Sequence, residues 1–414
     1  RRVLLRRYNA LSHVELIMST DSSKDGSSPR YSARGVSAEK HDVHQVVDRL
    51  DPGLFPGSFC KVIPDALGGS EQHCNIIHAD GSGTKSILAY LHYREFGDPA
   101  VFEGISQDSI VMNLDDLLCV GATGHVVLSN TLNRNARNCP GEVIRALIQG
   151  SEAFIQHLRD QGINIVSGGG ETADVGDLTG TITVDSNAVA RLRRDEVIRN
   201  HITGELCIVG LASSGRASYE TFENSGIGSN GLTSARHDLL ADYYRSQYPE
   251  TFDASMPEAL CYSGPYRLED ALPGSKHLSV GSALLSPTRT YAPLIDAILK
   301  AHRPQITALI HCSGGGQTKC LKFAHDTHIT KDNLFEPPPI FTAIETASRT
   351  PQKEMYQVFN MGHRMEVYTD PTTADAVITI AESFGIDAKI IGRTEPAEAN
   401  RLTLITPSGE TILY

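Results

Sequence analysis

Residues 141–170, GEVIRALIQGSEAFIQHLRDQGINIVSGGG, indicate the fold class of this chain. Apolar side chains recur at spacings of three and four across 141–160 and Gly162 follows, which predicts an amphipathic helix. The apolar run Ile163–Val166 then predicts a buried strand that ends at the glycine triplet 168–170. A helix followed at once by a buried strand is typical of proteins that combine helices with β-sheets.

Similar patterns continue along the rest of the chain. Strand patterns lie at 75–79 and 181–190, and a second series has strands at 205–211 and 307–312 around a helix at 292–301. With 414 residues, the chain is long enough for two domains of ordinary size. We therefore expect an α/β (α+β) fold with two domains.

The N-terminal region differs in composition from the rest. Residues 18–30 are almost entirely polar, which predicts disorder. The four arginines within Arg1–Ile17 are typical of a transit peptide, but Met18 is a credible start and we expect translation to begin there. The expected divisions are a flexible segment over 1–40, an N-terminal domain over 41–202 and a C-terminal domain over 203–414.

Composition narrows the class of protein. The formal net charge of −12 argues against a general nucleic-acid binder, which normally has a basic face. The eight cysteines include no C-x-x-C pair, which indicates reduced thiols. No apolar run approaches the ~18 residues of a membrane span. We therefore expect a cytoplasmic enzyme with neither a nucleic-acid nor a membrane partner.

The loop Asp80-Gly81-Ser82-Gly83-Thr84-Lys85 is the sharpest local signal. Glycines let the backbone approach a ligand closely. Lys85 could neutralise a phosphate, and Asp80 could hold a metal ion. The spacing is not that of a Walker A loop, and a plain turn is the alternative.

Three aspartates lie on the predicted helix Gln107–Val120. Asp108 is seven and eight residues before Asp115 and Asp116, so all three share a side of the helix. Asp108 and Asp115 are about 10 Å apart along the axis, too far to share one magnesium ion. They would contact different metal ions or different ends of a substrate. The alternative is a solvated acidic stripe.

Two further carboxylates follow the first glycine triplet. Glu171 and Asp174 could coordinate Mg²⁺ through oxygen, or could cap a helix. Together with the Asp80 loop and the aspartate helix, they favour a Mg–polyphosphate site. The hexapeptide SGGGET at 167–172 has a near-identical counterpart, SGGGQT, at 313–318. The similarity could reflect either duplication or coincidence.

The second half supplies candidate phosphate-binding segments. Glycine and serine runs at 213–215 and 229–231 could form backbone nests for a phosphate monoester. Arg289 could neutralise a phosphate or could hold a loop in place. His311 lies at a predicted strand end before a glycine triplet, so it could face a ligand or be a structural histidine.

Taken in order, these segments resemble the aminoimidazole ribonucleotide synthetase (phosphoribosylformylglycinamidine cyclo-ligase) family from about Tyr31 to Thr394. Asp115 stands where the family usually has asparagine. The matching segments are D-G-x-G-T-K at 80–85, the aspartates of 108–117, G-G-E-T-A at 169–173, S-S-G at 213–215, S-N-G at 229–231, P-T-R-x-Y at 287–291, H-x-x-G-G-G at 311–316 and E-M-Y-x-x-F-N-x-G at 354–362.

The resemblance implies two domains, each a mixed β-sheet flanked by helices, and a homodimer paired through the N-terminal ATP-binding domains. It implies that ATP and Mg²⁺ drive the cyclisation of formylglycinamidine ribonucleotide. Catalytic roles fall on Lys85, His311 and Asp116. Nucleotide contacts fall on Gly81, Ser82, Gly83, Thr84, Lys85, Gly169, Gly170 and Thr172. Substrate contacts fall on Ser214, Gly215, Ser229, Asn230 and Arg289. Metal contacts fall on Asp80, Asp108, Asp116, Glu171 and Asp174.

Two departures from the family touch ligand-binding positions. The family's K-D-A-G-V-D segment appears as Ser32–Ser37, where Arg34 could replace the missing lysine, and residues 216–228 form an insertion. The alternatives are a related kinase or synthetase, such as a thiamine-phosphate kinase or selenophosphate synthase, or a catalytically inactive binding relative. If Lys85 binds phosphate, Lys85→Ala should lose turnover with little loss of folding.

Overall fold

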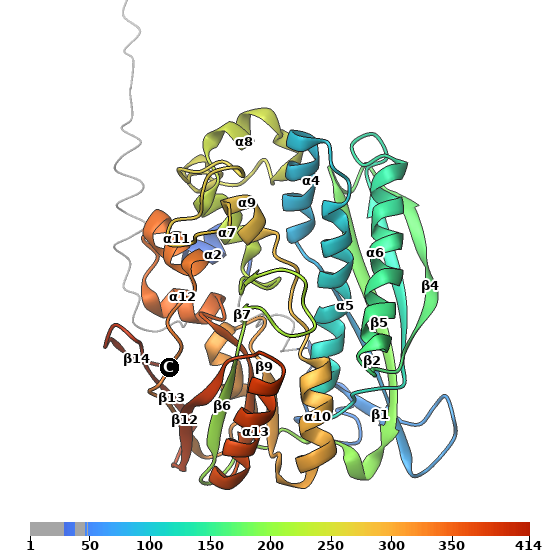
Figure 1. Cartoon of the computed structure of the whole chain (residues 1–414), viewed down its shortest axis with the longest axis vertical. Coiled ribbons are helices and arrows are strands. Elements are labelled where there is room, and N and C mark those ends of the chain that lie inside the picture. Colours follow the sequence, from blue (N-terminus) through green and yellow to red (C-terminus); the bar gives the residue numbers. More distant parts are fainter. Residues whose placement is uncertain (1–28, 38–45, 48) are drawn as a thin grey trace, which may run out of the picture.

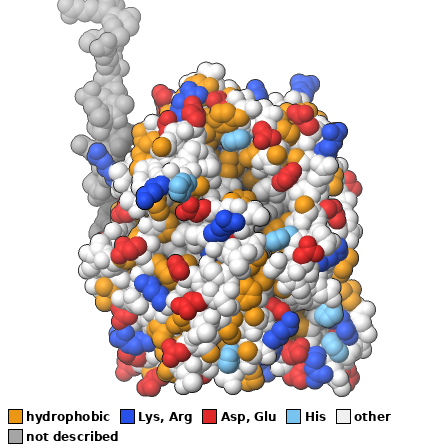
Figure 2. All heavy atoms as spheres, viewed as in Figure 1, with side chains coloured by type: hydrophobic (Ala, Val, Ile, Leu, Met, Phe, Trp, Pro, Cys, Tyr) orange, Lys and Arg blue, Asp and Glu red, His pale blue; other side chains and the backbone are white. Residues whose placement is uncertain are grey.

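The computed structural model of the chain describes residues 29–37, 46–47 and 49–414. The expected translation start, and residues 18–28 of the segment expected to be disordered, lie outside these ranges. For residues 29–30 the expectation of disorder is wrong, because they begin helix α2 (Pro29–Ala33). Among the described residues, no helix is both long and apolar enough to span a membrane. Acidic and basic side chains alternate over the face shown in Figure 2, with no basic patch on it.

The first sheet is built from residues 62–193 and has the strand order β1-β2-β5-β3-β4. β3 and β4 run parallel, and the other neighbours run antiparallel. Helices α5 and α6 lie along one face of this sheet (Figure 1). The elements are β1 Val62–Pro64, β2 His73–Gly81, α4 Lys85–Phe96, α5 Val101–Cys119, β3 Val126–Arg134, α6 Gly141–Asp160, β4 Ile165–Asp174 and β5 Ile182–Arg193.

The second sheet has the strand order β14-β13-β10-β12-β6-β11-β9. Only β10 and β13 are parallel neighbours. Helix α13 (Pro371–Ser383) packs on β6 and β12, and α10 (Ala292–His302) packs between α13 and α5. The strands are β6 Cys207–Ala212, β9 Ala308–His311, β10 Thr327–Lys331, β11 His363–Thr369, β12 Ala388–Pro396, β13 Arg401–Ile405 and β14 Thr411–Leu413.

Shorter elements gather at one end of the second sheet (Figure 1). They include a two-stranded ribbon, β7 with β8. The ribbon and the helices of this group are α2 Pro29–Ala33, β7 Ser214–Gly215, β8 Asn224–Ser225, α7 Leu232–Leu239, α8 Asp242–Gln247, α9 Val280–Leu284, α11 Pro339–Ser348 and α12 Gln352–Val358.

Helix α5 lies between the two halves. Its apolar residues Ile110 and Leu117 belong to one core cluster with Val209 of β6 and Leu309 of β9. The helix is therefore buried on almost every side, and Asp108 and Asp115 are fully buried. The alternative of a solvated acidic stripe is wrong, because the second half covers the side of the helix that carries the aspartates.

The architecture confirms the expected fold class, since both sheets are mixed and flanked by helices. Helix α6 begins and ends as its periodicity predicts. The first glycine triplet does not end its strand: β4 continues through it to Asp174. The second triplet does follow a strand end, at His311, and continues into a 3₁₀ turn. The two similar hexapeptides therefore have different structures.

Candidate active site

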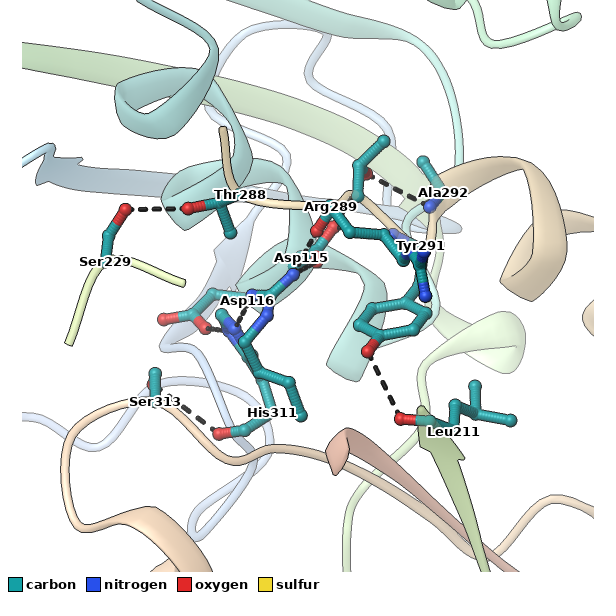
Figure 3. A network of polar contacts seen from close by, with 12 residues as sticks. Asp115, Asp116, Leu211, Ser229, Thr288, Arg289, Tyr291, Ala292, His311 and Ser313 are labelled. Carbon is teal, nitrogen blue, oxygen red and sulfur yellow. Dashed lines mark hydrogen bonds and ion pairs between the residues drawn. The ribbon is translucent and has the colours of Figure 1, made fainter. Parts of the chain in front are cut away.

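Asp116 on α5 lies at the centre of a polar network that joins the two halves. Its carboxylate accepts a hydrogen bond from His311 Nδ1 of β9 at 2.5 Å and contacts His78 Nε2 of β2 at 3.2 Å. Figure 3 shows Asp116 and His311 facing one another. Burial raises the pKa of Asp116, but the two imidazoles outweigh burial and hold it well below its usual range. Asp116 is therefore an ionised acid next to two rings.

Arg364 of β11 fixes the protonation of His311. Its Nη1 contacts His311 Nε2. Because a guanidinium can only donate, Nε2 accepts and the ring proton lies on Nδ1, directed at Asp116. Arg364 Nη2 also pairs with Asp115 Oδ2 at 3.0 Å. His311 is thus a neutral ring with both nitrogens engaged, and its side chain is fully buried.

His78 has the opposite character. The amide nitrogen of Asn113 donates to the carbonyl groups of Asp80, Ser109 and Ser186 at 3.0 Å each. The amide oxygen of Asn113 therefore accepts from His78 Nδ1, at 3.0 Å. With Nε2 on Asp116, both ring nitrogens donate, so His78 is an imidazolium. Burial lowers its pKa, but the bond to Asp116 outweighs burial and the pKa is raised. Its side chain is 21% exposed.

Two residues of this network carried too weak a signal in the sequence. His78 lies two residues before Asp80, the first residue of the loop. A single histidine in a strand is usually structural, so it was not predicted as a site residue. Arg364 lies just after the E-M-Y segment. The ion pair with Arg364 explains how Asp115 can be fully buried, because the carboxylate has a charged partner. Burial still raises the pKa of Asp115 above its usual value.

Lys85 is enclosed between the halves. Its ammonium donates to Asp108 Oδ1 at 2.8 Å and to the carbonyl groups of Gly228 at 3.1 Å and Ser286 at 2.6 Å. The side chain is fully buried, and burial lowers its pKa. All three N–H groups have partners, so a polyphosphate could be bound only by displacing one of them.

Asp108 is bound from both halves. Besides Lys85, its Oδ1 accepts from Thr288 N at 2.7 Å and from Thr288 Oγ1 at 2.6 Å. Thr288 Oγ1 also lies 2.7 Å from Ser229 Oγ, as Figure 3 shows. Asp108 Oδ2 and Asn230 Oδ1 are buried without hydrogen-bond partners among the described residues. The two predicted substrate residues Ser229 and Asn230 therefore adjoin the lysine–aspartate pair.

Arg289 holds the predicted phosphate loop in place. Its guanidinium forms a bidentate pair with Glu220, at 3.0 and 2.6 Å. The remaining N–H groups donate to the carbonyl groups of Ala212, Ser214 and Gly215 at 2.9 to 3.0 Å. All five donors are engaged, so Arg289 is oriented to position the backbone of Ser214 and Gly215.

The loop that carries Gly81–Thr84 leaves β2 beside β5. A Cβ at Gly81 would overlap the carboxylate of Asp185, which explains the glycine. Gly83 has a φ of +55° and an open side. Thr84 Oγ1 lies 3.0 Å from Thr233 Oγ1 of α7, which links this loop to the second half.

The five predicted metal ligands do not converge on one point. A row of paired residues crosses the sheet from Asp80 on β2 to Gly170 on β4 through β5 and β3, a distance of about 14 Å. Glu171 lies next to Gly170, and Asp174 pairs with Arg134 at 2.8 Å near the same edge. Neither can share with Asp80 an ion whose oxygen ligands lie about 2.1 Å from it.

Asp80 and Asp116 are the two predicted ligands that the structure brings together. Burial raises the pKa of Asp80, and repulsion from Asp116 raises it further. A divalent cation would relieve this repulsion. Across the described residues, the group of three possible ligands that meets within 4.8 Å is a different one, Cys312, His363 and Glu366, and Lys331 already pairs with Glu366.

The predicted nucleotide residues of β4 line a pocket of about 170 Å³ between α5, α6 and the sheet. Its walls carry hydroxyl groups and two carboxylates, and no Lys, Arg or His lines it. Such a lining suits an uncharged sugar or base better than phosphates. The pocket includes Gly169, Gly170, Glu171 and Thr172 together with Ser106, Ser109, Ser151 and Asn130.

Comparisons with known proteins give a consistent result over both halves. The model of the AIR synthase related protein N-terminal domain matches residues 60–192, and that of the C-terminal domain matches 207–405. A phosphoribosylformylglycinamidine cyclo-ligase of Methanocaldococcus jannaschii is 29% identical over 77% of each chain. One of Methanothermobacter thermautotrophicus is 27% identical over 92% of this chain and 98% of its own.

Solved structures share the fold at low identity. AaThiL complexed with AMPPCP and TMP matches with a TM-score of 0.53 and 11% identity, over 89% of this chain and 92% of that chain. T. maritima PurL complexed with FGAR matches with a TM-score of 0.51 and 14% identity, over 89% of this chain and 49% of that chain.

Proposed function

Because the chain belongs to the AIR synthase related protein family, we propose that it catalyses ATP-dependent cyclisation of formylglycinamidine ribonucleotide to aminoimidazole ribonucleotide, with release of ADP and phosphate. The observation that carries this proposal is that both domain models match in order over most of the chain. Curated relatives that align over three quarters or more of both chains are named as this cyclo-ligase.

The chemistry needs an activated oxygen. An amide oxygen is a poor leaving group, so the γ-phosphoryl group moves from ATP to the formyl oxygen and ADP leaves. The amidine nitrogen then attacks the formyl carbon, and the C–O bond breaks with release of phosphate. Such a reaction depends on positioning and charge neutralisation more than on a protein nucleophile.

The network around Asp116 supplies groups suited to this task. Ionised Asp116 and Asp80 would hold Mg²⁺, which supplies charge neutralisation at the transferring phosphoryl group. His78 adds a fixed positive charge on the exposed side of the same carboxylate. His311, neutral and buried, positions Asp116 from the opposite side.

Nucleotide binding is supported from two directions. A solved structure of the same fold, AaThiL, was obtained with AMPPCP, a nucleotide analogue. In this chain, the β4 pocket would take the uncharged nucleoside part of ATP, through Gly169, Gly170 and Thr172. Within the Gly81–Thr84 loop, Gly81 N donates to Asp80 and Ser82 N donates to Val184 O, so the phosphates would be bound through the backbone N–H groups of residues 83–84, next to Asp80.

We further propose a cytoplasmic homodimer with two domains, divided near residues 203–204. Separate sheets and separate domain models support the division. The face of the first sheet away from α5 and α6 supports the dimer, since among the described residues Ile77, Val127 and Val166 on it are 58%, 48% and 45% exposed. A contiguous apolar face of this kind is typical of an interface.

A turnover assay with ATP, Mg²⁺ and formylglycinamidine ribonucleotide tests the reaction. We expect ADP and aminoimidazole ribonucleotide to form in a ratio of one to one. ADP formation without the ribonucleotide would instead identify a kinase of the same fold. Neither product from a folded chain that still binds ATP would identify an inactive binding relative.

A further inference from the structure

Arg236 of α7 is a buried cation for which the described residues provide no acceptor. It is 2% exposed, and its Nε and Nη1 have no hydrogen-bond partners. The ring of Tyr262 lies beside it, with its centroid 5.7 Å from the guanidinium carbon. Folded proteins satisfy nearly all buried polar groups, so a guanidinium left in this state indicates a missing water or ion.

The contact of Arg236 Nη2 with His237 Nε2, at 3.1 Å, does not satisfy the guanidinium. The backbone N–H of Tyr262 donates to His237 Nδ1 at 3.1 Å. A neutral His237 must then carry its proton on Nε2, the nitrogen that faces Arg236. Two N–H groups face each other, and this is repulsive.

The nearest acid cannot serve Arg236 either. Asp238 receives Arg34 through both oxygens, at 2.6 and 3.0 Å, and receives Arg30 at 2.8 Å. All three nitrogens of Arg34 have partners, because it also donates to Ser234 and to the carbonyl group of Leu260. Two guanidinium groups thus share Asp238, and with Arg236 and the neighbouring Glu354 counted, three cations face two carboxylates at this end of α7. The excess of positive charge calls for a further anion.

We propose that Arg236 is the anchor of a phosphate-binding site at α7. Guanidinium groups bind phosphate oxygens through charge-assisted hydrogen bonds, and Nε and Nη1 of Arg236 each keep an N–H group that no described residue accepts from. The site lies on the helix that follows the predicted substrate residue Asn230, because α7 begins at Leu232 and Arg236 is its fifth residue. The inference rests on the proposed function only in naming the phosphate monoester of the ribonucleotide as the natural ligand.

The segment around α2 provides the entrance. Tyr31 N donates to Glu354 of α12 at 3.1 Å, and Arg30 and Arg34 bind Asp238 of α7. These contacts hold α2 against α12 and against this end of α7. The side chain of Arg30 is 31% exposed there. Phosphate enters when α2 lifts. This also gives Arg34 a different role from the nucleotide contact considered from the sequence, namely to close the site over its ligand.

Unfolding temperatures measured with inorganic phosphate test the site. Phosphate is added to the full chain against sodium chloride of equal ionic strength, which separates binding from charge screening. We expect a saturable rise of Tm by a few degrees for the unmodified chain, because a ligand that binds only the folded state stabilises it. Arg236→Met should abolish the rise. Without phosphate it should leave Tm unchanged or higher, since it removes an uncompensated buried charge.

Two further variants complete the test. Arg245→Met, which alters a partly buried arginine paired with Glu258, should keep the full rise. Arg236→Lys keeps a charge but loses the planar set of N–H donors, so the rise should need several times more phosphate. The site is overturned if the unmodified chain shows no rise, or if Arg236→Met and Arg236→Lys keep it unchanged. Since the readout involves no turnover, an inactive chain with a phosphate response would refute only the proposed reaction.

Discussion

The ammonium of Lys85 is one of the polar contacts that hold the two halves together. It joins α4 to the carbonyl groups of residues 228 and 286 and neutralises Asp108. Removing one partner of a buried ion pair leaves an uncompensated charge and costs about 3–5 kcal/mol. The structure therefore changes the expectation for Lys85→Ala from a loss of turnover alone to a loss of stability.

A double-mutant cycle separates these readings of Lys85. We expect Lys85→Met to lower the free energy of unfolding by about 3 kcal/mol or more, because Asp108 is left buried and unpaired. Lys85→Met combined with Asp108→Asn should recover part of this loss. Denaturant unfolding measures both. A stable, inactive Lys85→Met would instead support the phosphate contact.

His237 should make the stability of the chain depend on pH. Burial, followed by the charges of Arg236 and Arg34, lowers its pKa to about 2. Below about pH 6.5 the unfolded chain gains a proton at this position that the folded chain refuses. Stability therefore falls as pH falls below that value.

The variant His237→Asn keeps an acceptor for Tyr262 N but cannot be protonated. In phosphate-free buffer, we expect the difference in unfolding free energy between this variant and the unmodified chain to shift in favour of the variant from pH 7 to pH 5. Parallel curves would show that His237 titrates normally. The other histidines contribute equally to both proteins and cancel.

Residue types were easier to predict than their partners. The sequence located Asp108, Asp115 and Asp116 on one side of a helix. It could not show that Lys85, Arg364 and the two histidines neutralise them, because these partners lie 23 to 249 positions away. Long-range pairing of charges leaves no local pattern.

The bounds of helices and strands could be predicted from the hydrophobic pattern where only one face of the element is buried. Helix α6 has a clear apolar stripe, and its bounds could be predicted. Helix α5 is buried by both halves. Its mixture of apolar and acidic residues therefore predicted a more exposed helix than the structure has. Strand β4 runs through three glycines that usually break strands, because parallel pairing with β3 holds it in place.

The glycines of β4 provide a test at this scale. A Cβ at Gly170 would overlap the carbonyl group of Asn130 on β3. We expect Gly170→Ala to destabilise the chain by about 1–3 kcal/mol and to weaken ATP binding at the β4 pocket. The matched control is Gly141→Ala at the start of α6, where a Cβ meets nothing within 4 Å. It should be neutral or stabilising by about 0.5–1 kcal/mol. Equal effects in unfolding experiments would contradict the role of close packing.

At the scale of the whole molecule, the uncovered face of the first sheet predicts how two copies associate. Val127→Asp places a charge in the middle of this face, and we expect it to convert a dimer into a monomer in sedimentation experiments. Leu413→Asp on β14 is the control, because Leu413 is 64% exposed but lies on the other sheet. A monomeric unmodified chain, or a dimer unaffected by Val127→Asp, would remove the sheet face from the interface.

The central claim concerns the fate of one oxygen atom, and an isotope experiment follows it directly. Formylglycinamidine ribonucleotide labelled with ¹⁸O at the formyl group is incubated with the chain, ATP and Mg²⁺, and the inorganic phosphate is analysed by mass. We expect one labelled oxygen in each phosphate, together with equal amounts of ADP and aminoimidazole ribonucleotide. Unlabelled phosphate, or ADP without ring closure, would contradict the proposed reaction.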